Sequence, residues 1–355
     1  MAKDRLHELK QTSASFQARG IVSGMKKEKA YQSGTSKNGG KWNSLEFNLM
    51  INEKKSIFIK LNGFPRSEVY YYKSGEKKGE KGTTKKVSWK DRKKSPGEGF
   101  RLIGINISVG KDENGKNVNE MFTEYDAVEH LHNSLKDGES LFIKGNMVFS
   151  SFTDRNDQLK RKVELNPTQI SYTQDPVDFS ADDFKEMAEF ENTLVFSDIE
   201  KETDESGNST GRFVLSGYSI GYNTVEAVSF IVTNAKLAGN LKKKMKSSNS
   251  IKTYGRINVV TNVSAVEESD DDGWGESSPM ERLNTPVIRE YVIYKAVPDS
   301  IDVETYSDAD IAKALKAIKN AKDASEKFVE DNNEDTEDWG DDDGFADDDD
   351  SPWDD

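Results

Sequence analysis

The sequence contains no cysteine among its 355 residues and only three histidines, His7, His130 and His132. Without thiols, the chain can form neither disulfides nor thiolate metal sites. Three histidines are too few for a zinc site, and His130 and His132 lie two residues apart, on different faces of a helix. We therefore expect neither a metal nor a cofactor.

Long hydrophobic runs and catalytic motifs are also missing. No stretch approaches the roughly 18 apolar residues of a membrane span, and the start, MAKDRLHELK, lacks a signal-peptide core. There is no Gly-rich phosphate loop followed by Lys-Ser or Lys-Thr and no nucleophile paired with histidine. Clusters of Asp in a flexible run do not hold two metal ions in a fixed geometry. We predict a soluble intracellular protein that is not an enzyme.

Charge is unevenly distributed along the chain. The formal net charge is −14, and residues 331–355 alone carry 14 acidic and no basic side chains. Residues 1–175 contain 32 Lys or Arg against 22 Asp or Glu, whereas residues 176–330 contain 18 against 28. The basic front half favours a polyanionic partner. The alternative is that the asymmetry only serves solubility.

The acidic tail, residues 331–355, has too little apolar surface and too much like charge to fold alone, so we predict that it is disordered. Trp339, Phe345 and Trp353 are spaced through it. Such aromatics are typical of anchors for a basic, partly apolar pocket. A merely solvated tail is the alternative.

Strand patterns dominate the first half. Leu45, Phe47, Leu49 and Ile51 alternate with polar residues, and a return strand over 57–61 places Phe58 and Lys60 on its outer face. Further strands are expected at 16–25, 100–109, 141–149 and 163–172, with a helix at 126–135. A Gly- and Lys-rich insertion at 65–99 interrupts this unit and is predicted to be a long mobile loop.

The same order returns in the second half, with strands at 190–201, 211–219, 225–232, 250–263 and 286–296 and a helix at 235–245. SLFIKGNMVF (140–149) aligns with SIKTYGRINV (250–259), which places Gly145 on Gly255. We interpret this as an internal duplication. A last helix over 302–330 has Ser307 as its N-cap and Asp310 in a capping box.

Five strands with a helix between the third and fourth are the element order of the OB-fold. The sequence therefore predicts a mainly β protein with two tandem OB-fold-like five-stranded barrels, a C-terminal helix and a disordered acidic tail. The expected domains are 16–175 and 185–300, after a flexible N-terminus over 1–15. The second domain carries an acidic loop at 264–281.

OB-folds commonly hold single-stranded nucleic acid by stacking bases on aromatic rings and binding phosphates with Lys and Arg. The first domain offers both kinds of side chain on strands two to four, in the insertion and beside the loop between strands four and five. The candidate nucleic-acid-binding residues are Arg19, Trp42, Phe58, Lys60, Tyr70, Tyr71, Tyr72, Lys85, Lys86, Trp89, Lys90, Arg92, Lys93, Lys94, Lys144, Phe152, Arg155, Lys160, Arg161 and Lys162.

Each aromatic candidate has an alternative. Trp42 and Phe58 can instead pack under a loop, and the three tyrosines can brace the base of the insertion. The second domain offers a weaker set of stacking side chains, Tyr218, Tyr222, Tyr254 and Arg256. Its acidic loop repels phosphates, which favours protein contact or a structural role for much of that half.

Together, the barrel, the basic aromatic groove and the acidic C-terminus resemble the single-stranded DNA-binding proteins of bacteria and their phages. That resemblance implies DNA replication, recombination and repair as the setting, and recruitment of replication or recombination proteins by the tail tip. The matching tip residues are Asp347, Asp348, Asp349, Asp350, Pro352 and Trp353. The final Asp354 and Asp355 depart from the pattern.

The resemblance further implies a phage-type tandem version, a monomer or dimer, in the cytoplasm of a bacterial host. The competing hypothesis is a recombination mediator or polymerase accessory scaffold acting mainly through protein contacts. RNA is a third possible ligand, because stacking grooves serve both polymers.

Overall fold

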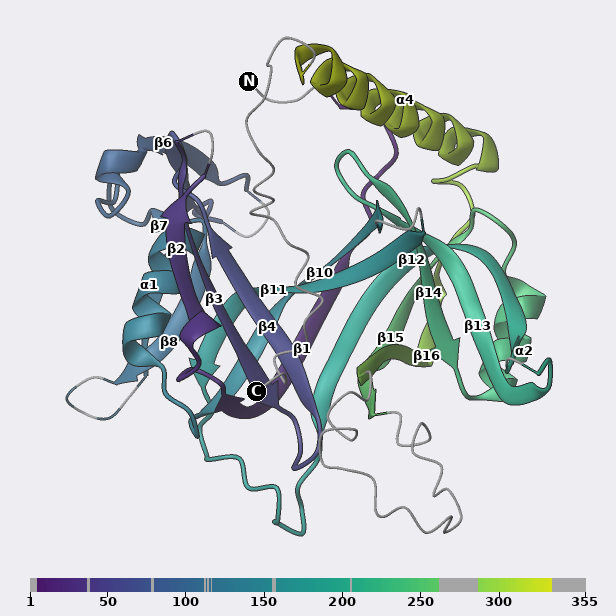
Figure 1. Ribbon diagram of the computed structural model, residues 1–355, viewed down its shortest axis with the longest axis horizontal. Coiled ribbons are helices and arrows are strands. Elements are labelled where there is room, and N and C mark those ends of the chain that lie inside the picture. Colours follow the sequence, from purple (N-terminus) through teal and green to yellow (C-terminus); the bar gives the residue numbers. More distant parts are fainter. Residues whose placement is uncertain are drawn as a thin grey trace. The chain divides into compact units, whose positions relative to one another are not determined.

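The computed structural model describes residues 5–36, 39–77, 80–111, 113, 115, 117–154, 158–204, 206–261 and 287–333. It is mainly β, as the sequence predicts (Figure 1). The chain divides into two compact units. The first unit is Ala14–Asn192, and the second unit combines Met1–Ser13 with Thr193–Asp355. The whole of the predicted acidic loop at 264–281, and the tail beyond residue 333, lie outside the described residues.

The strands of the first unit follow one pairing order. β1 (Ala14–Ser23) pairs antiparallel with both β3 (Lys41–Met50) and β10 (Ser140–Thr153). β3 pairs in turn with β2 (Tyr31–Thr35) and β4 (Ser56–Gly63), and η1 (Glu28–Ala30) precedes β2. β11 (Leu159–Tyr172) pairs antiparallel with β10 and runs parallel to β8 (Ile105–Lys111), which also pairs with β9 (Asn117–Phe122). A parallel pair needs a crossover connection, and α1 (Glu124–Ser134) lies in it.

The core of the first unit confirms the predicted alternation. Leu45, Phe47 and Leu49 on β3 and Ile57, Ile59 and Leu61 on β4 are all at most 3% exposed. α1 adds three fully buried side chains, Ala127, Val128 and Leu131. Its first turn is capped by Thr123, whose hydroxyl accepts the backbone N–H of Asp126 at 3.1 Å.

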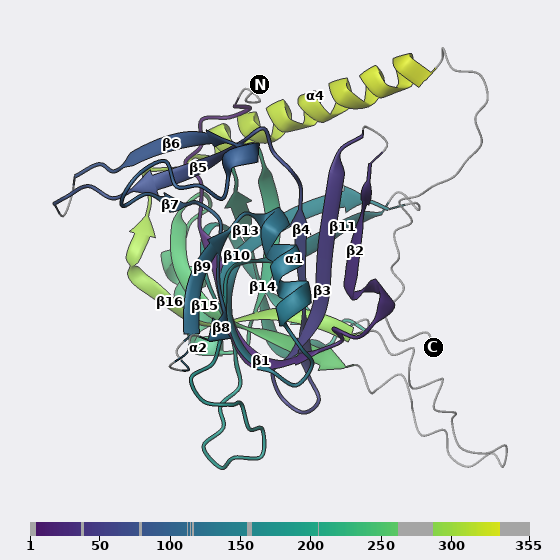
Figure 2. The ribbon, with the colours of Figure 1, turned by 90° about the vertical axis from the view of Figure 1, so that its left-hand side faces the viewer.

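The insertion is folded, contrary to the predicted mobile loop. β5 (Glu68–Lys73), β6 (Thr83–Ser88) and β7 (Arg101–Leu102) form a three-stranded sheet in the order β6-β5-β7, which we call the insertion sheet (Figure 2). η2 (Trp89–Asp91) follows β6. The runs EVYYYK and TTKKVS are rich in β-branched and aromatic residues, which favour strands more strongly than the surrounding Gly and Lys favour a loop.

The predicted basic loop between β10 and β11 is also largely strand. β10 continues to Thr153, and β11 already begins at Leu159. Their last pairs are Phe152 with Lys160 and Thr153 with Leu159. Residues 150–153 and 159–162 are therefore the end of a long hairpin. Cross-strand pairing continues beyond the residues at which apolar alternation stops, so alternation alone ends the strands too early.

The second unit repeats the order. Its first three strands are β12 (Met187–Thr203), β13 (Ser209–Ile220) and β14 (Val225–Val232). β13 pairs antiparallel with both β12 and β14. After α2 (Ala235–Lys244), β15 (Ser250–Thr261) and β16 (Val287–Asp302) pair antiparallel, and β16 runs parallel to β14. β15 is also a neighbour of β12, so each of the five strands has two neighbours. The first residues of β12, 187–192, pair with β1 and belong to the first unit.

The two units share irregularities at matching positions. A β-bulge separates Lys144 from Gly145 on β10, and another separates Tyr254 from Gly255 on β15. A Cβ atom at Gly145 would stand 2.1 Å from the carbonyl oxygen of Asn166. The glycine that aligns in the sequence therefore lies at the bulge of the fourth strand in both units.

Residues 5–13 are not the flexible N-terminus that the sequence predicts. Leu9 is buried, and the backbone N–H of Thr12 donates to the carbonyl of Ile220 at 2.9 Å. Leu9 joins a hydrophobic cluster of the second unit with Tyr306 and Ile311. The segment is ordered because Leu9 packs into this core. Its partners lie about 300 residues away along the chain, so the polar sequence around Leu9 does not indicate the contact.

The C-terminal helix α4 (Asp308–Asn333) begins directly after the predicted N-cap Ser307, six residues later than the predicted start at 302, where β16 still continues, and it extends three residues past the predicted end. The Ser307 hydroxyl accepts the backbone N–H of Asp310 at 3.1 Å and donates to its carboxylate at 2.6 Å. Within the described part of the chain, none of the helices combines the length and the apolar character needed to span a membrane.

Candidate nucleic-acid interface

The outer face of β3 and β4 carries three of the predicted residues. Phe58 lies opposite Asn48 and is half-buried, and Lys60 lies opposite Glu46 and forms an ion pair with it. Trp42 lies over Gly34 of β2, where a Cβ atom would stand 3.1 Å from the indole ring. This face therefore presents partly covered rings, and its one lysine is already neutralised by a carboxylate.

The insertion sheet separates the three consecutive tyrosines onto two faces. Tyr70 and Tyr72 are 41% and 42% exposed, whereas Tyr71 is only 5% exposed. The Tyr71 hydroxyl donates to the carbonyl of Arg92 at 2.6 Å, and burial raises the pKa of its phenol. The prediction that Tyr71 stacks on a base is therefore wrong, because its ring is covered by protein. It braces the insertion instead.

Two cations share the exposed face with Tyr70 and Tyr72. Lys86 lies opposite Tyr70, with its ammonium 5.7 Å from the ring centroid, and also pairs with Glu68 at 3.1 Å. That hydrogen bond to Glu68 raises the pKa of Lys86. Arg101 lies opposite Tyr72 and is exposed, and it forms no ion pair with any described carboxylate.

Arg101 was missed by the sequence prediction because it follows the insertion and begins a strand that looks like part of the barrel. Only the pairing of β7 with β5 places it beside Tyr72. Lys85, which was predicted, lies on the opposite face from Tyr70 and Tyr72, with its ammonium 4.6 Å from the centroid of Phe100. The exposed face of the insertion sheet is thus defined by Tyr70, Tyr72, Lys86 and Arg101.

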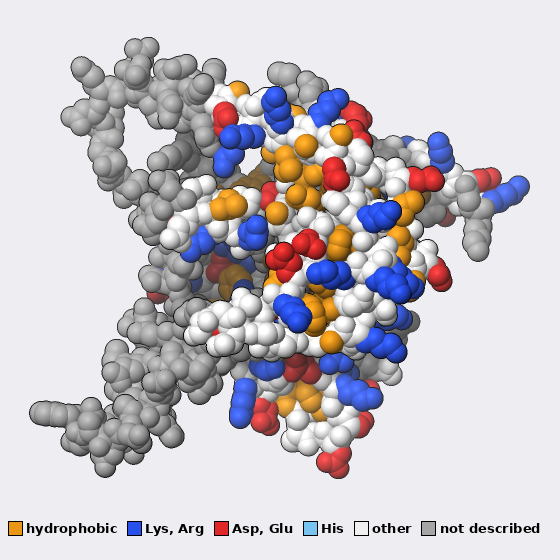
Figure 3. Space-filling model, turned by 90° about the vertical axis from the view of Figure 1, so that its right-hand side faces the viewer, with side chains coloured by type: hydrophobic (Ala, Val, Ile, Leu, Met, Phe, Trp, Pro, Cys, Tyr) orange, Lys and Arg blue, Asp and Glu red, His pale blue; other side chains and the backbone are white. Residues whose placement is uncertain are grey.

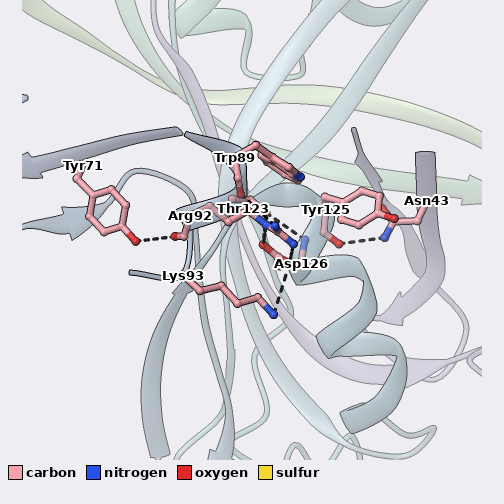
Figure 4. A network of polar contacts seen from close by, with 8 residues as sticks. All are labelled: Asn43, Tyr71, Trp89, Arg92, Lys93, Thr123, Tyr125 and Asp126. Atoms are coloured by element: carbon pink, nitrogen blue, oxygen red, sulfur yellow. Dashed lines mark hydrogen bonds and ion pairs between the residues drawn. The ribbon is translucent and has the colours of Figure 1, made fainter. Parts of the chain in front are cut away.

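Arg92 attaches the insertion to the start of α1 (Figure 4). Its Nε and Nη2 atoms donate to the two carboxylate oxygens of Asp126, each at 2.8 Å, and its guanidinium lies 4.3 Å from the centroid of Trp89. Trp89 in turn meets Tyr125 edge to face, with centroids 6.1 Å apart. Arg92 and Trp89 are therefore packing and ion-pair partners, not free binding groups as predicted.

Asp126 is buried at the centre of this contact. Burial alone would raise the pKa of its carboxyl, but hydrogen bonds from Arg92 and from the Thr123 hydroxyl outweigh burial and lower the pKa below its usual value. The same carboxyl lies 3.9 Å from the ammonium of Lys93. Lys90 is exposed, and Lys94 pairs with Asp91 at 3.1 Å.

The end of the β10–β11 hairpin places the predicted residues on two faces. Phe152 is 40% exposed opposite Lys160, and Lys162 lies on the same face two residues along. Arg161 lies on the other face, opposite Ser151. Lys160 and Lys162 have acidic neighbours, Asp154 at 3.6 Å and Glu164 at 3.1 Å.

Lys144 is exposed further along β10. The prediction that Arg19 binds nucleic acid is wrong, because its side chain is half-buried and its Nη2 donates to the carbonyl of Lys185 at 3.4 Å. Arg155 lies outside the described residues, as do all six predicted tip residues, Asp347, Asp348, Asp349, Asp350, Pro352 and Trp353.

Two surfaces of the first unit therefore combine exposed aromatic rings with cations, the insertion sheet and the hairpin end. Such pairs can stack on planar bases and bind phosphates. On the side seen in Figure 3, Lys and Arg are interspersed with Asp and Glu. Local pairing of rings and cations, and not a general positive field, distinguishes the candidate interface.

The solved structures to which this chain is similar include two crystal structures of the single-stranded DNA-binding protein from Thermus aquaticus. A deletion mutant is 9% identical with a TM-score of 0.39, covering 84% of this chain and 98% of its own. The wild-type protein is 8% identical with a TM-score of 0.37, covering 81% and 93%. No curated protein matches the sequence.

A family model gives the clearest match. The YorF model matches residues 73–335, well over half of the chain, from the insertion sheet to the end of α4. It does not name the phage-type tandem single-stranded DNA-binding protein that the sequence resembles. The chain belongs to the YorF family.

Proposed function

We propose that this protein binds single-stranded DNA largely independently of sequence. The observation that carries the proposal is the exposed face of the insertion sheet, where Tyr70 and Tyr72 stand beside Lys86 and Arg101. Each tyrosine offers a ring to stack on a base, and each has a cation directly across the strand. Stacking tolerates any base because every base has a π-face.

The architecture supports the same function. In the first unit β8 runs parallel to β11, β10 pairs with β1, and α1 lies between β8 and β10 along the chain. In the second unit β14 runs parallel to β16, β15 pairs with β12, and α2 lies between β14 and β15. We propose that each unit is an OB-fold barrel and that the chain is a tandem version. Barrels of this kind bind oligonucleotides beside strands two and three and the loop between strands four and five. β3, β4 and the β10–β11 hairpin end occupy these positions in the first unit.

A single strand suits this surface better than a duplex. Duplex bases bury their faces against one another, so Tyr70 and Tyr72 can stack only on unpaired bases. The cations on the face are few and partly neutralised, as the Lys86–Glu68 pair illustrates. Phosphate attraction alone would therefore give weak binding, and the rings must supply much of the affinity.

The test is titration of a fluorescently labelled oligo-dT with the full chain, its Tyr70→Ala/Tyr72→Ala variant and a Tyr71→Phe control. Each lost stack weakens binding by about 1–3 kcal/mol. Tyr71→Phe keeps the covered ring and leaves DNA affinity unchanged. Equal affinity of the double variant and the wild type would refute the proposed interface. A matched oligo-U determines whether RNA is the preferred ligand.

We further propose a role in DNA replication, recombination and repair, as a non-enzymatic protein of the bacterial cytoplasm. In this role residues 331–355 recruit replication or recombination proteins, with Trp353 as the anchor. The acidic composition of these residues supports this, since their charge suits a basic partner pocket. Capture of replication proteins by the full chain but not by the 1–330 truncation is the expected result. Equal capture by both contradicts tail recruitment.

If the protein is instead a recombination mediator or polymerase accessory scaffold acting mainly through protein contacts, partner capture persists while DNA binding is absent. The same pair of proteins, tested in both assays, therefore separates this alternative from the proposed function. Sedimentation of the full chain distinguishes the expected monomer or dimer from larger assemblies.

A further inference from the structure

The outer face of β15 and β16, in the second unit, carries a second set of aromatic and cationic side chains. Lys252, Tyr254 and Arg256 alternate along β15 with the buried residues Thr253 and Gly255. They project from the same side of the strand. The sheet pairs Tyr254 directly with Lys295 of β16.

The bulge beside Gly255 enlarges this face. Tyr254 pairs with Lys295 and Gly255 pairs with Ile293, so Tyr294 is the extra residue on β16. Neighbouring residues on a regular strand point to opposite faces, but Tyr294 is 43% exposed and Lys295 is exposed too. A bulge commonly re-aims a side chain in this way. It gives β16 both a ring and a cation at the surface.

Cations surround both rings. The ammonium of Lys252 lies 5.6 Å from the centroid of Tyr254 and that of Lys295 lies 5.5 Å from it. The guanidinium of Arg256 lies 5.3 Å from the centroid of Tyr294. Arg256 and Lys295 form no ion pair with any described carboxylate. Two neighbouring strands thus bring three cations close to the rings of Tyr254 and Tyr294. Two of these cations, Arg256 and Lys295, have no described carboxylate as an ion-pair partner.

A cavity of about 330 Å³ continues this surface beyond Lys252. Its lining includes a second lysine, Lys10, and the hydroxyl of Ser250, whereas the Ser300 hydroxyl there already donates to the carbonyl of Val297. Asp302 also lines it, but its carboxylate accepts the backbone N–H groups of Glu304 and Thr305. Ammonium and hydroxyl groups are the donors that a phosphate requires.

We propose that the outer face of β15 and β16 is a second binding surface for single-stranded nucleic acid, with Tyr254 and Tyr294 stacking on bases and Lys252, Arg256 and Lys295 binding phosphates. The observations favour this ligand over an acidic peptide. Binding of an acidic peptide needs the cations but does not explain why the half-buried ring of Tyr254 and the exposed ring of Tyr294 each have cations beside them. The proposal rests on the proposed function, single-strand binding, but its surface is distinct from the insertion sheet and is tested separately from it.

The test uses the full chain with Tyr254→Ala/Tyr294→Ala and Tyr254→Phe/Tyr294→Phe variants, each checked for wild-type unfolding. A long labelled oligo-dT is titrated at low salt, both in the wild-type background and with Tyr70→Ala/Tyr72→Ala. We expect the Ala pair to weaken binding roughly 5- to 150-fold per lost stack. The Phe pair restores affinity because it keeps the rings. Leu315→Ala, at an exposed apolar residue of α4 in the same unit, serves as the control and leaves affinity unchanged.

Photocrosslinking to an oligonucleotide containing 5-bromodeoxyuridine gives a direct readout, with adducts expected on peptides containing Tyr254 or Tyr294. The proposal is overturned if the Tyr254→Ala/Tyr294→Ala variant binds oligo-dT as tightly as its parent in both backgrounds and crosslinks form only on residues 68–102. The proposed function then remains intact. A second result also overturns it: polyglutamate abolishes the crosslinks of the oligonucleotide to this face, while the Ala pair leaves the affinity for oligo-dT unchanged. That result assigns the face to an acidic peptide. Absence of any oligo-dT binding by the wild type overturns both.

Discussion

Arg92 and Asp126 are joined by two hydrogen bonds of 2.8 Å, and this pair connects the insertion sheet to the N-terminus of α1. Asp126 lies in the first turn of that helix, where a carboxylate is also favoured by the helix dipole. The pair is mostly buried, with 19% of the Arg92 side chain and 8% of the Asp126 side chain exposed. The exposed tyrosines therefore project from a sheet that a structural ion pair holds in place.

Breaking this pair should destabilise the first unit. Arg92→Met and Asp126→Asn each remove one partner of a mostly buried ion pair, and we expect each to lower the free energy of unfolding by about 2–4 kcal/mol. Urea unfolding of the single and double variants gives the coupling energy. Amide hydrogen exchange should quicken first within 68–102. Additive effects of the two substitutions would show that the residues do not act as a pair.

The same pair predicts a pH dependence. The pKa of Asp126 is lowered in the folded state, so its contribution to stability is complete above the unfolded pKa of about 3.9. It is lost as the pH falls from about 4 through the lower, folded pKa. The difference in unfolding free energy between wild type and Asp126→Asn should therefore shrink below about pH 4. A difference that stays constant from pH 7 to pH 3 argues against the assignment.

Gly145, at the bulge of β10, should not tolerate a larger side chain. Gly145→Ala places a Cβ atom 2.1 Å from the carbonyl oxygen of Asn166, and backbone atoms cannot move without breaking the β10–β11 pairing. We expect a loss of about 2–3 kcal/mol in unfolding free energy. Gly110→Ala is the matched control, because nothing lies within 4 Å of the added atom. Thermal unfolding of the two variants compares them directly.

Glu46 should restrain the affinity for nucleic acid. It neutralises Lys60 on the outer face of β4. Glu46→Gln frees that ammonium, so we expect tighter oligo-dT binding at low salt and a salt dependence steeper by up to about 0.7 in log–log slope. Lys60→Gln in the Glu46→Gln background should remove the gain. Unchanged binding in Glu46→Gln would place Lys60 outside the path of the strand.

Apolar alternation made the barrel strands predictable, because Leu45 to Leu49 and Ile57 to Leu61 are buried on one side only. The capping box at Ser307 predicted the start of α4 for the same kind of local reason. The insertion was not predictable in this way. Its strands are short, and one of them, β7, lies within residues 100–109, which the sequence assigns to a single strand of the main sheet.

The candidate site was only partly predictable. Composition drew attention to the insertion and its tyrosines, but three consecutive tyrosines cannot all face outward on one strand, and Tyr71 is buried. Arg92 looked like a phosphate ligand because its partner, Asp126, lies 34 residues away along the chain. Arg101 was missed because its neighbour across the sheet is Tyr72. These long-range pairings decide which cations remain available, and local sequence does not encode them.

The central claim is that exposed tyrosines beside cations bind unpaired bases. The most direct measurement is titration of the full chain with labelled oligo-dT and with a duplex of equal length, at two salt concentrations. The account predicts preferential binding of the single strand, retained in part at the higher salt because stacking is not screened. Absence of single-strand binding at low salt, or equal affinity for the duplex, would contradict it.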